Sequence, residues 1–187
     1  IEINDFAVIV AQAALWIAES QMMKETEDLV HKKLDFLPLK SYANIVEGNA
    51  LRIDWETVVP KEKLNYIMGN PPFVGAKLCN ASQRKDKETI LGKEGGKLDY
   101  VACWYRKAAD YSSTNPNIEI AYVSTNSISQ GEQVPLLWKH ILSLGYTINF
   151  AYTTFKWESQ SNDTAAVHCI IIGYSKNSRS KKVLYHG

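Results

Sequence analysis

An amide side chain and two prolines follow directly on a short apolar segment, in the residues Asn70, Pro71, Pro72 and Phe73. The Asn70 side-chain oxygen is a neutral hydrogen-bond acceptor, and proline rigidity aims the Pro71 carbonyl as a second acceptor at little entropic cost. Two acceptors on the two N–H bonds of a planar, conjugated amine, such as the exocyclic nitrogen of adenine, would free its lone pair. Phe73 offers a stacking face worth about 1–3 kcal/mol. These four residues predict alkylation of an aromatic amine.

A simpler interpretation of the same residues is a turn at the end of a strand, because Asn and Pro favour turns for conformational reasons alone. We favour the chemical interpretation because the whole string Asn-Pro-Pro-Phe comes directly after an apolar strand, and average composition makes a chance match rare. The reaction would need no strong base, since attack on a positively charged sulfonium methyl group neutralises charge.

Segments with strand and helix patterns alternate along the chain, which predicts an α/β fold with a mostly parallel sheet. Residues 77–97 are polar and glycine-bearing, and we expect a loop there. The two last strands are separated by too few residues for a helical crossover, so they are predicted to form an antiparallel hairpin at the sheet edge. The expected helices are 6–31, 98–113 and 132–145, and the expected strands are 43–51, 64–69 (buried), 118–126, 147–155 and 165–174.

The composition excludes several classes of protein. The 187 residues suit one domain, and 21 Lys+Arg against 20 Asp+Glu give nucleic-acid binding no support from global charge. The three cysteines form no close pair, as expected of reduced thiols in the cytoplasm, and the four scattered histidines predict no metal site. No apolar run reaches the roughly 20 residues of a bilayer span. The basic turn 176–182 could touch phosphate, although a solvated turn is the simpler interpretation.

The Asn-Pro-Pro-Phe string resembles motif IV of amino-methyltransferases that use S-adenosylmethionine. Asn in first place resembles N6-adenine DNA methyltransferases more than N4-cytosine enzymes, while methyltransferases of protein glutamine share the motif. The flanking segments 69–78, 98–111, 121–134 and 148–174 together resemble the methyltransferase region of bacterial MmeI-like (type IIG/IIL) combined restriction–modification enzymes. The resemblance covers nearly the whole chain and implies a Rossmann-like class I methyltransferase sheet.

The resemblance also implies the cofactor site. Glu2 falls where the family's acidic residue binds the ribose hydroxyls of S-adenosylmethionine, and Ile3 where a side chain packs on the adenine ring. Asn49 and Ala50 fall at motif III, where the family usually has an Asp; a plain turn is the alternative there. The family's glycine-rich loop and first strand are absent, so residues 1–187 are expected to be a partial catalytic domain that is inactive alone.

Phe155 and Trp157 fall in the hairpin loop that matches motif VIII, where an aromatic residue contacts the flipped base, and either could be the contact. The implied function is methyl transfer to the N6 amine of adenine in double-stranded DNA, in the bacterial cytoplasm. Target-recognition and nuclease domains of the same parent chain are the expected partners. The alternatives are a methyltransferase for RNA or protein glutamine, and a non-catalytic α/β scaffold.

Overall fold

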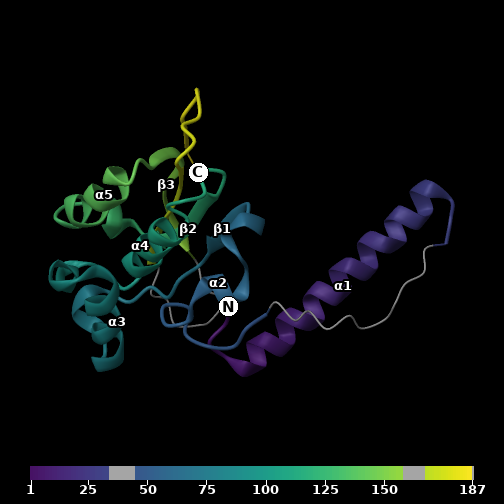
Figure 1. The fold of residues 1–187 in the computed structure, drawn as a ribbon, viewed down its shortest axis with the longest axis horizontal. Coiled ribbons are helices and arrows are strands. Elements are labelled where there is room, and N and C mark those ends of the chain that lie inside the picture. The colour runs from purple at the N-terminus through teal and green to yellow at the C-terminus, as the bar shows by residue number, and fades with distance from the viewer. Residues whose placement is uncertain (34–44, 158–166, 187) are drawn as a thin grey trace. The chain divides into compact units, whose positions relative to one another are not determined.

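The computed structural model describes residues 1–33, 45–157 and 167–186. It divides the chain into two compact units, Ile1–Val59 and Pro60–Gly187, which are described separately below. Figure 1 labels the helices and strands.

The first unit contains the long helix α1, Asp5–Val30, which confirms the predicted helix 6–31. The helix is capped by Asn4, whose Oδ1 atom accepts the N–H of Ala7 at 3.0 Å. It ends at His31, whose φ of 51° is left-handed. Cap residues with short polar side chains satisfy the N–H groups that the first helical turn leaves unpaired.

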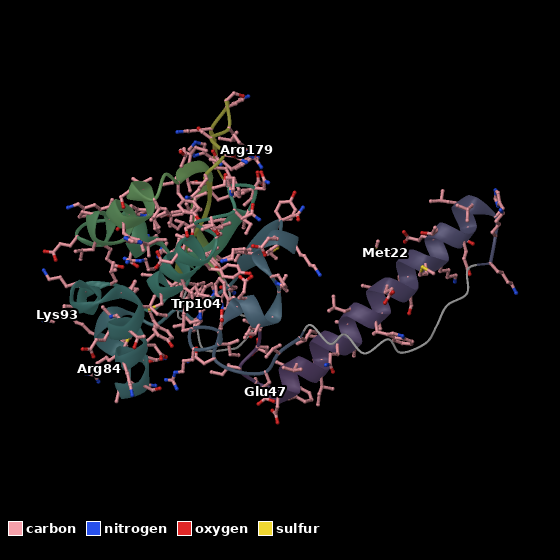
Figure 2. The ribbon with its side chains drawn as sticks, viewed as in Figure 1. Met22, Glu47, Arg84, Lys93, Trp104 and Arg179 are labelled. Atoms are coloured by element: carbon pink, nitrogen blue, oxygen red, sulfur yellow. The ribbon has the colours of Figure 1, made fainter. Side chains whose placement is uncertain are left out.

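Many residues of α1 are apolar, and none of its residues is buried. Phe6 and Leu29 are 70% and 81% exposed, and Met22 is labelled in Figure 2. An 18-residue window of α1 has a mean hydropathy of 1.4, so this helix is long and apolar enough to cross a membrane. This differs from the expectation that no segment reaches such a length. Apolar helices inside globular proteins share both properties, so it is weak evidence for a membrane.

The other described residues of the first unit form a β-bridge, a turn and a short helix. The predicted strand 43–51 is reduced, within the described residues, to one parallel bridge between Glu2 and Glu47. Residues 43–44 lie outside the described part of the chain. A turn beginning at Asn49 leads to the short helix α2, Trp55–Val58, capped by Asp54.

The second unit contains a five-stranded sheet with the order β1-β2-β4-β3-β5. Pairing is parallel for β1 with β2 and for β3 with β5, and antiparallel on both sides of β4. Four described strands therefore run in one direction and β4 runs against them, which confirms the predicted α/β class with its antiparallel hairpin. The strands are β1 Tyr66–Gly69, β2 Glu119–Thr125, β3 Thr147–Trp157, β4 Val167–Ser175 and β5 Val183–Tyr185.

Helices α4, Ala102–Tyr111, and α5, Gln133–Ser143, cover one face of this sheet (Figure 1). Tyr105 of α4 is fully buried, and its hydroxyl donates to the carbonyl of Tyr122 on β2 at 3.2 Å. Tyr174 of β4 donates to the Tyr105 carbonyl at 2.8 Å, and Trp138 of α5 packs edge-on against Tyr105. The core is thus an aromatic layer in which the buried hydroxyls of Tyr105 and Tyr174 have partners, as buried polar atoms require.

Two expectations about the second unit were wrong. Residues 77–97 are not a loop, because they contain the helix α3, Ala81–Leu91, on which Arg84 is labelled in Figure 2. Its signal was the capping box of Asn80 and Gln83, which exchange side-chain and backbone hydrogen bonds. Strand β1 is not buried either, and Met68 is 75% exposed. Among the described strands it pairs with β2 alone, so it lies at the edge of the described sheet.

The end of the chain adds the strand β5, which the sequence did not predict. It pairs with β3, so the hairpin strand β3 is not the outermost strand of the described sheet. Opposite β5, the ladder of β3 and β4 is irregular, and the ring of Phe150 lies over Gly173. A Cβ atom added to Gly173 would stand 2.0 Å from that ring, so this glycine is required for close packing.

Candidate active site

The Asn-Pro-Pro-Phe corner lies at the carboxyl end of β1. The strand is paired with β2 up to Gly69, opposite Tyr122, and Asn70 follows immediately. Asn70 and Pro72 are exposed, Pro71 is buried and Phe73 is half-buried. The N–H of Val74 donates to the Pro72 carbonyl at 3.1 Å and closes the corner as a tight turn. In open α/β sheets, ligands bind beyond the carboxyl ends of the strands.

The Asn70 amide is available to a ligand. Within the part of the chain that the structure describes, its side chain has no hydrogen-bond partner. The buried ring of Pro71 fixes the backbone next to it. The corner therefore presents one free polar side chain on a backbone whose φ angles two prolines restrict.

The exit of this corner is tied to the end of β2 through Asp99, a residue that the sequence analysis did not single out. Asp99 is 8% exposed, and its Oδ1 atom accepts the N–H of Ala76 at 2.9 Å. Its Oδ2 atom accepts the hydroxyl of Thr125 at 3.2 Å and also that of Ser127. The carboxylate thus joins the segment after Phe73 to the last residue of β2.

Phe155 and Trp157 lie in the strand β3 rather than in a loop, which corrects the prediction. Phe155 pairs with Cys169 of β4, which itself pairs with Thr125 of β2. Because β1, β2 and β3 run in the same direction, Phe155 reaches the same end of the sheet as Asn70 and is half-buried there. Trp157 is the last residue of β3 and pairs with Val167. The loop that follows lies outside the described residues.

The predicted cofactor residues lie together in the first unit. Glu2 donates its N–H to the Val46 carbonyl at 3.0 Å and accepts the N–H of Gly48 at 2.7 Å, which places it beside the turn of Asn49 and Ala50. Its Oε1 atom accepts the N–H of Ile3 at 2.9 Å. The Oε2 atom of the same carboxylate adds further acceptor positions, which suit ribose hydroxyls.

Two neighbouring side chains bear on the same site. Ile3 is 68% exposed, as an apolar platform for a ring would be in the free protein. The Asn49 side-chain oxygen accepts the N–H of Leu51 at 2.9 Å. This bond stabilises a turn, which was the alternative interpretation of Asn49 to a cofactor contact. The Ala50 carbonyl accepts from the Trp55 indole at 2.8 Å. Glu2 and Ile3 therefore present a carboxylate and an exposed apolar side chain next to each other, and Asn49 and Ala50 shape the backbone beside them.

Two cysteines of the second unit, Cys103 and Cys169, are poorly suited to nucleophilic chemistry. Burial raises the pKa of the Cys103 thiol to about 12 and also raises the pKa of Cys169. A thiol is nucleophilic only as the thiolate. Among the described residues, no three His, Cys, Asp or Glu side chains gather as a possible metal site.

Comparison with known proteins assigns the chain to a family. Residues 1–186 match the family model "MmeI, DNA-methyltransferase domain". The chain belongs to this family. This confirms the resemblance that the sequence analysis drew from the Asn-Pro-Pro-Phe corner and its flanks.

Two relatives illustrate the membership. A Bacillus subtilis (strain 168) protein described as DNA methyltransferase A is 43% identical over 179 residues, which are 93% of this chain and 20% of that protein. The solved structure of the type IIL restriction–modification enzyme MmeI in complex with DNA is 45% identical, with a TM-score of 0.91. It covers 99% of this chain, which spans 25% of the MmeI polypeptide.

Proposed function

We propose that this chain forms part of the catalytic domain of a DNA methyltransferase that transfers a methyl group from S-adenosylmethionine to the N6 amine of adenine. The observation that carries the proposal is the Asn70 amide, exposed and unpartnered among the described residues at the carboxyl end of β1, in a chain of the MmeI methyltransferase family. The activity, cofactor and substrate of the complete protein belong to this proposal.

The chain's own residues would act by holding the amine. The Asn70 side-chain oxygen accepts one N–H bond of a flipped adenine and the Pro71 carbonyl accepts the other, which localises the nitrogen lone pair. Phe73 stacks on the base, and Phe155 or Trp157, at the end of β3, contacts it from another strand. Neither acceptor is a strong base, so the proton leaves to water after the new N–C bond forms.

The cofactor would be held by the first unit. The Glu2 carboxylate accepts the ribose hydroxyls, Ile3 packs on the adenine ring, and the turn of Asn49 and Ala50 lies beside them. S-adenosylmethionine supplies an electrophilic methyl group on a positively charged sulfur, and the electrons of the broken S–C bond remain on that sulfur. In this proposal, residues 1–187 form a partial domain that is inactive alone.

The partners in the proposal are double-stranded DNA and further domains of the same polypeptide in the bacterial cytoplasm. The MmeI structure contains DNA, and this chain spans a quarter of that polypeptide. Target recognition and cleavage would lie in the remaining parts, in keeping with a nearly balanced charge of 21 cationic and 20 anionic side chains here.

The test is methyl transfer by the complete protein that carries this chain. Tritiated S-adenosylmethionine is supplied with duplex DNA, transfer RNA or a release-factor protein, and the labelled DNA is digested to nucleosides. We expect label in N6-methyldeoxyadenosine. Label only in RNA or in protein glutamine, or only in N4-methylcytosine, would contradict the proposal. No label in any acceptor, with Asn70→Ala equal to wild type, would indicate a scaffold.

A further inference from the structure

A buried carboxylate ties the exit of the Asn-Pro-Pro-Phe corner to the end of β2. The corner enters from β1, whose ladder with β2 ends at Gly69 opposite Tyr122. It leaves through Val74 and Ala76. The Ala76 N–H is bound by Asp99 Oδ1 at 2.9 Å, and the Val74 carbonyl accepts the N–H of Tyr100 at 2.9 Å.

Asp99 anchors this exit to the same strand that anchors the entry. Its second carboxylate oxygen accepts the hydroxyls of Thr125, the last residue of β2, and Ser127 just beyond it. Its own N–H donates to the Gln133 side chain at the start of α5 at 3.1 Å. The Asp99 carboxylate therefore connects the corner to the end of β2, and the Asp99 backbone N–H adds a bond to the start of α5.

A carboxylate is suited to this task because it only accepts hydrogen bonds and can accept several at once. Hydrogen bonds to an ionised group are about twice as strong as neutral ones. Because Asp99 is only 8% exposed, water competes little with these donors for the carboxylate oxygens. Without the carboxylate, the corner would be held at its entry by the ladder and at its exit chiefly by the bond between Val74 and Tyr100.

We propose that Asp99 is a positioning residue for methyl transfer, which holds the Pro71 carbonyl and the Asn70 side chain at the spacing that the two N–H bonds of the amine require. The inference rests on the proposed function. Asp99 does not touch the reacting atoms. It acts through Ala76 and Val74, because a displacement of these residues moves Phe73 and the two prolines with them.

The test compares Asp99→Ala, Asp99→Asn and Ser127→Ala in the complete protein. For Asp99→Ala we expect kcat to fall about 100-fold, as for a misplacement of roughly 1 Å, with unchanged KM for S-adenosylmethionine. Asp99→Asn keeps an oxygen for the Ala76 N–H and offers an amide to the two hydroxyls, so it should lie within about fivefold of wild type. Ser127→Ala removes one donor and should also cost about fivefold.

The matched control is Asn149→Ala. Asn149 is 4% exposed and donates to Ser175 and to the Asn177 carbonyl, at the opposite end of the sheet. The control should lower stability and leave kcat unchanged below its melting temperature. Equal losses of kcat in Asp99→Ala and Asn149→Ala would overturn the proposal, because they would show a general effect of instability.

Amide hydrogen exchange at Val74 adds a readout that does not depend on activity. This N–H binds the Pro72 carbonyl and not Asp99, so its exchange reports the corner itself. We expect roughly tenfold faster exchange in Asp99→Ala, equivalent to a local loss of about 1.4 kcal/mol, and near-wild-type exchange in Asp99→Asn. Unchanged exchange would refute the anchoring.

The outcomes separate this inference from the proposed function. If the wild-type protein labels no deoxyadenosine, the function fails, while the exchange at Val74 still decides whether Asp99 holds the corner. If wild type is active and Asp99→Ala keeps its kcat, only the positioning role fails. If Asp99→Ala does not fold, the kcat of Ser127→Ala tests the positioning role instead, and an unchanged kcat in that variant overturns the proposal.

Discussion

Both ends of the sheet in the second unit contain polar side chains that make several hydrogen bonds, but the two ends differ in whether a polar side chain is left exposed. At the amino end, Asn149 binds Ser175, the Asn177 carbonyl and the N–H of Arg179. Both oxygens of Glu119 accept from Arg179, labelled in Figure 2, at 2.8 Å. At the carboxyl end, Asp99 also makes several hydrogen bonds, but the neighbouring Asn70 amide is exposed.

This difference shows how to separate structure from function in such a fold. A buried polar side chain with all its bonds made is compatible with either role, because buried polar groups must be paired in any case. An exposed amide on a backbone held by two prolines gains nothing for stability from its own side chain. The basic turn 176–182 illustrates the structural case, since Lys176 reaches the Ser113 carbonyl and Arg179 reaches Glu119.

The largest effect is expected at the carboxyl end, from Asn70→Ala. Loss of one preorganised hydrogen-bonding group at a reacting centre costs about 10²–10³-fold in kcat. Single-turnover transfer of tritiated methyl groups measures it, with thermal unfolding as the control. Because the side chain is exposed, the melting temperature should not fall. A variant with wild-type kcat would remove Asn70 from the mechanism.

The corresponding change at the amino end, Asn149→Ala, should destabilise without affecting the chemistry. It removes the bonds of the Asn149 amide to the buried Ser175 hydroxyl and to the Arg179 N–H, at a cost of about 1–3 kcal/mol of unfolding free energy. Urea unfolding measures this loss. Were kcat to fall as far as it does in Asn70→Ala, the distinction between the two ends would be lost.

A smaller effect is expected from Phe73→Ala. The stacking face is removed, at a cost of about 1–3 kcal/mol in base binding, while Phe73→Tyr keeps the ring and should behave as wild type. Fluorescence of 2-aminopurine at the target position reports how long the flipped base is held. Equal behaviour of the alanine and tyrosine variants would show that Phe73 only packs within the protein.

The smallest effect is expected at the exposed pair Lys97–Glu132, whose Nζ and Oε2 atoms lie 2.8 Å apart. Hydrogen bonding and charge attraction lower the pKa of Glu132 and raise that of Lys97. The stability that ionised Glu132 contributes is present above the pKa of Glu132 in the unfolded chain, and it is lost as the pH falls through the lower pKa of the folded protein. The stability that charged Lys97 contributes is lost as the pH rises through its raised pKa in the folded protein. Since both groups are solvent-screened, Lys97→Ala should not measurably change the melting temperature.

The sequence predicted the corner because its determinants are local. Asn70 to Phe73 are consecutive, and the apolar run before them indicates a strand whose carboxyl end they must occupy. The same locality explains why α1, α4, α5 and the hairpin of β3 with β4 were predicted correctly. Apolar spacing along a segment reports the period of its secondary structure directly.

Asp99 was missed because its partners are distant in sequence. Its carboxylate binds residues 23, 26 and 28 positions away, and an Asp ahead of a helical pattern suggests only a cap. Helix α3 was missed because its charged composition resembles a loop, although Asn80 and Gln83 carried a capping signal. Strand β5 is only three residues long, and its pairing with β3 is a long-range property.

The contact between Phe150 and Gly173 has a consequence for how sequences of this family can vary. Because an added Cβ at position 173 would stand 2.0 Å from the Phe150 ring, Gly173 cannot gain a side chain unless that ring is displaced or replaced. A larger residue at 173 requires a smaller one at 150 in the same step, since overpacked cores are destabilised. In a library that randomises both positions, functional clones should therefore show paired substitutions, and single replacements of Gly173 should be depleted.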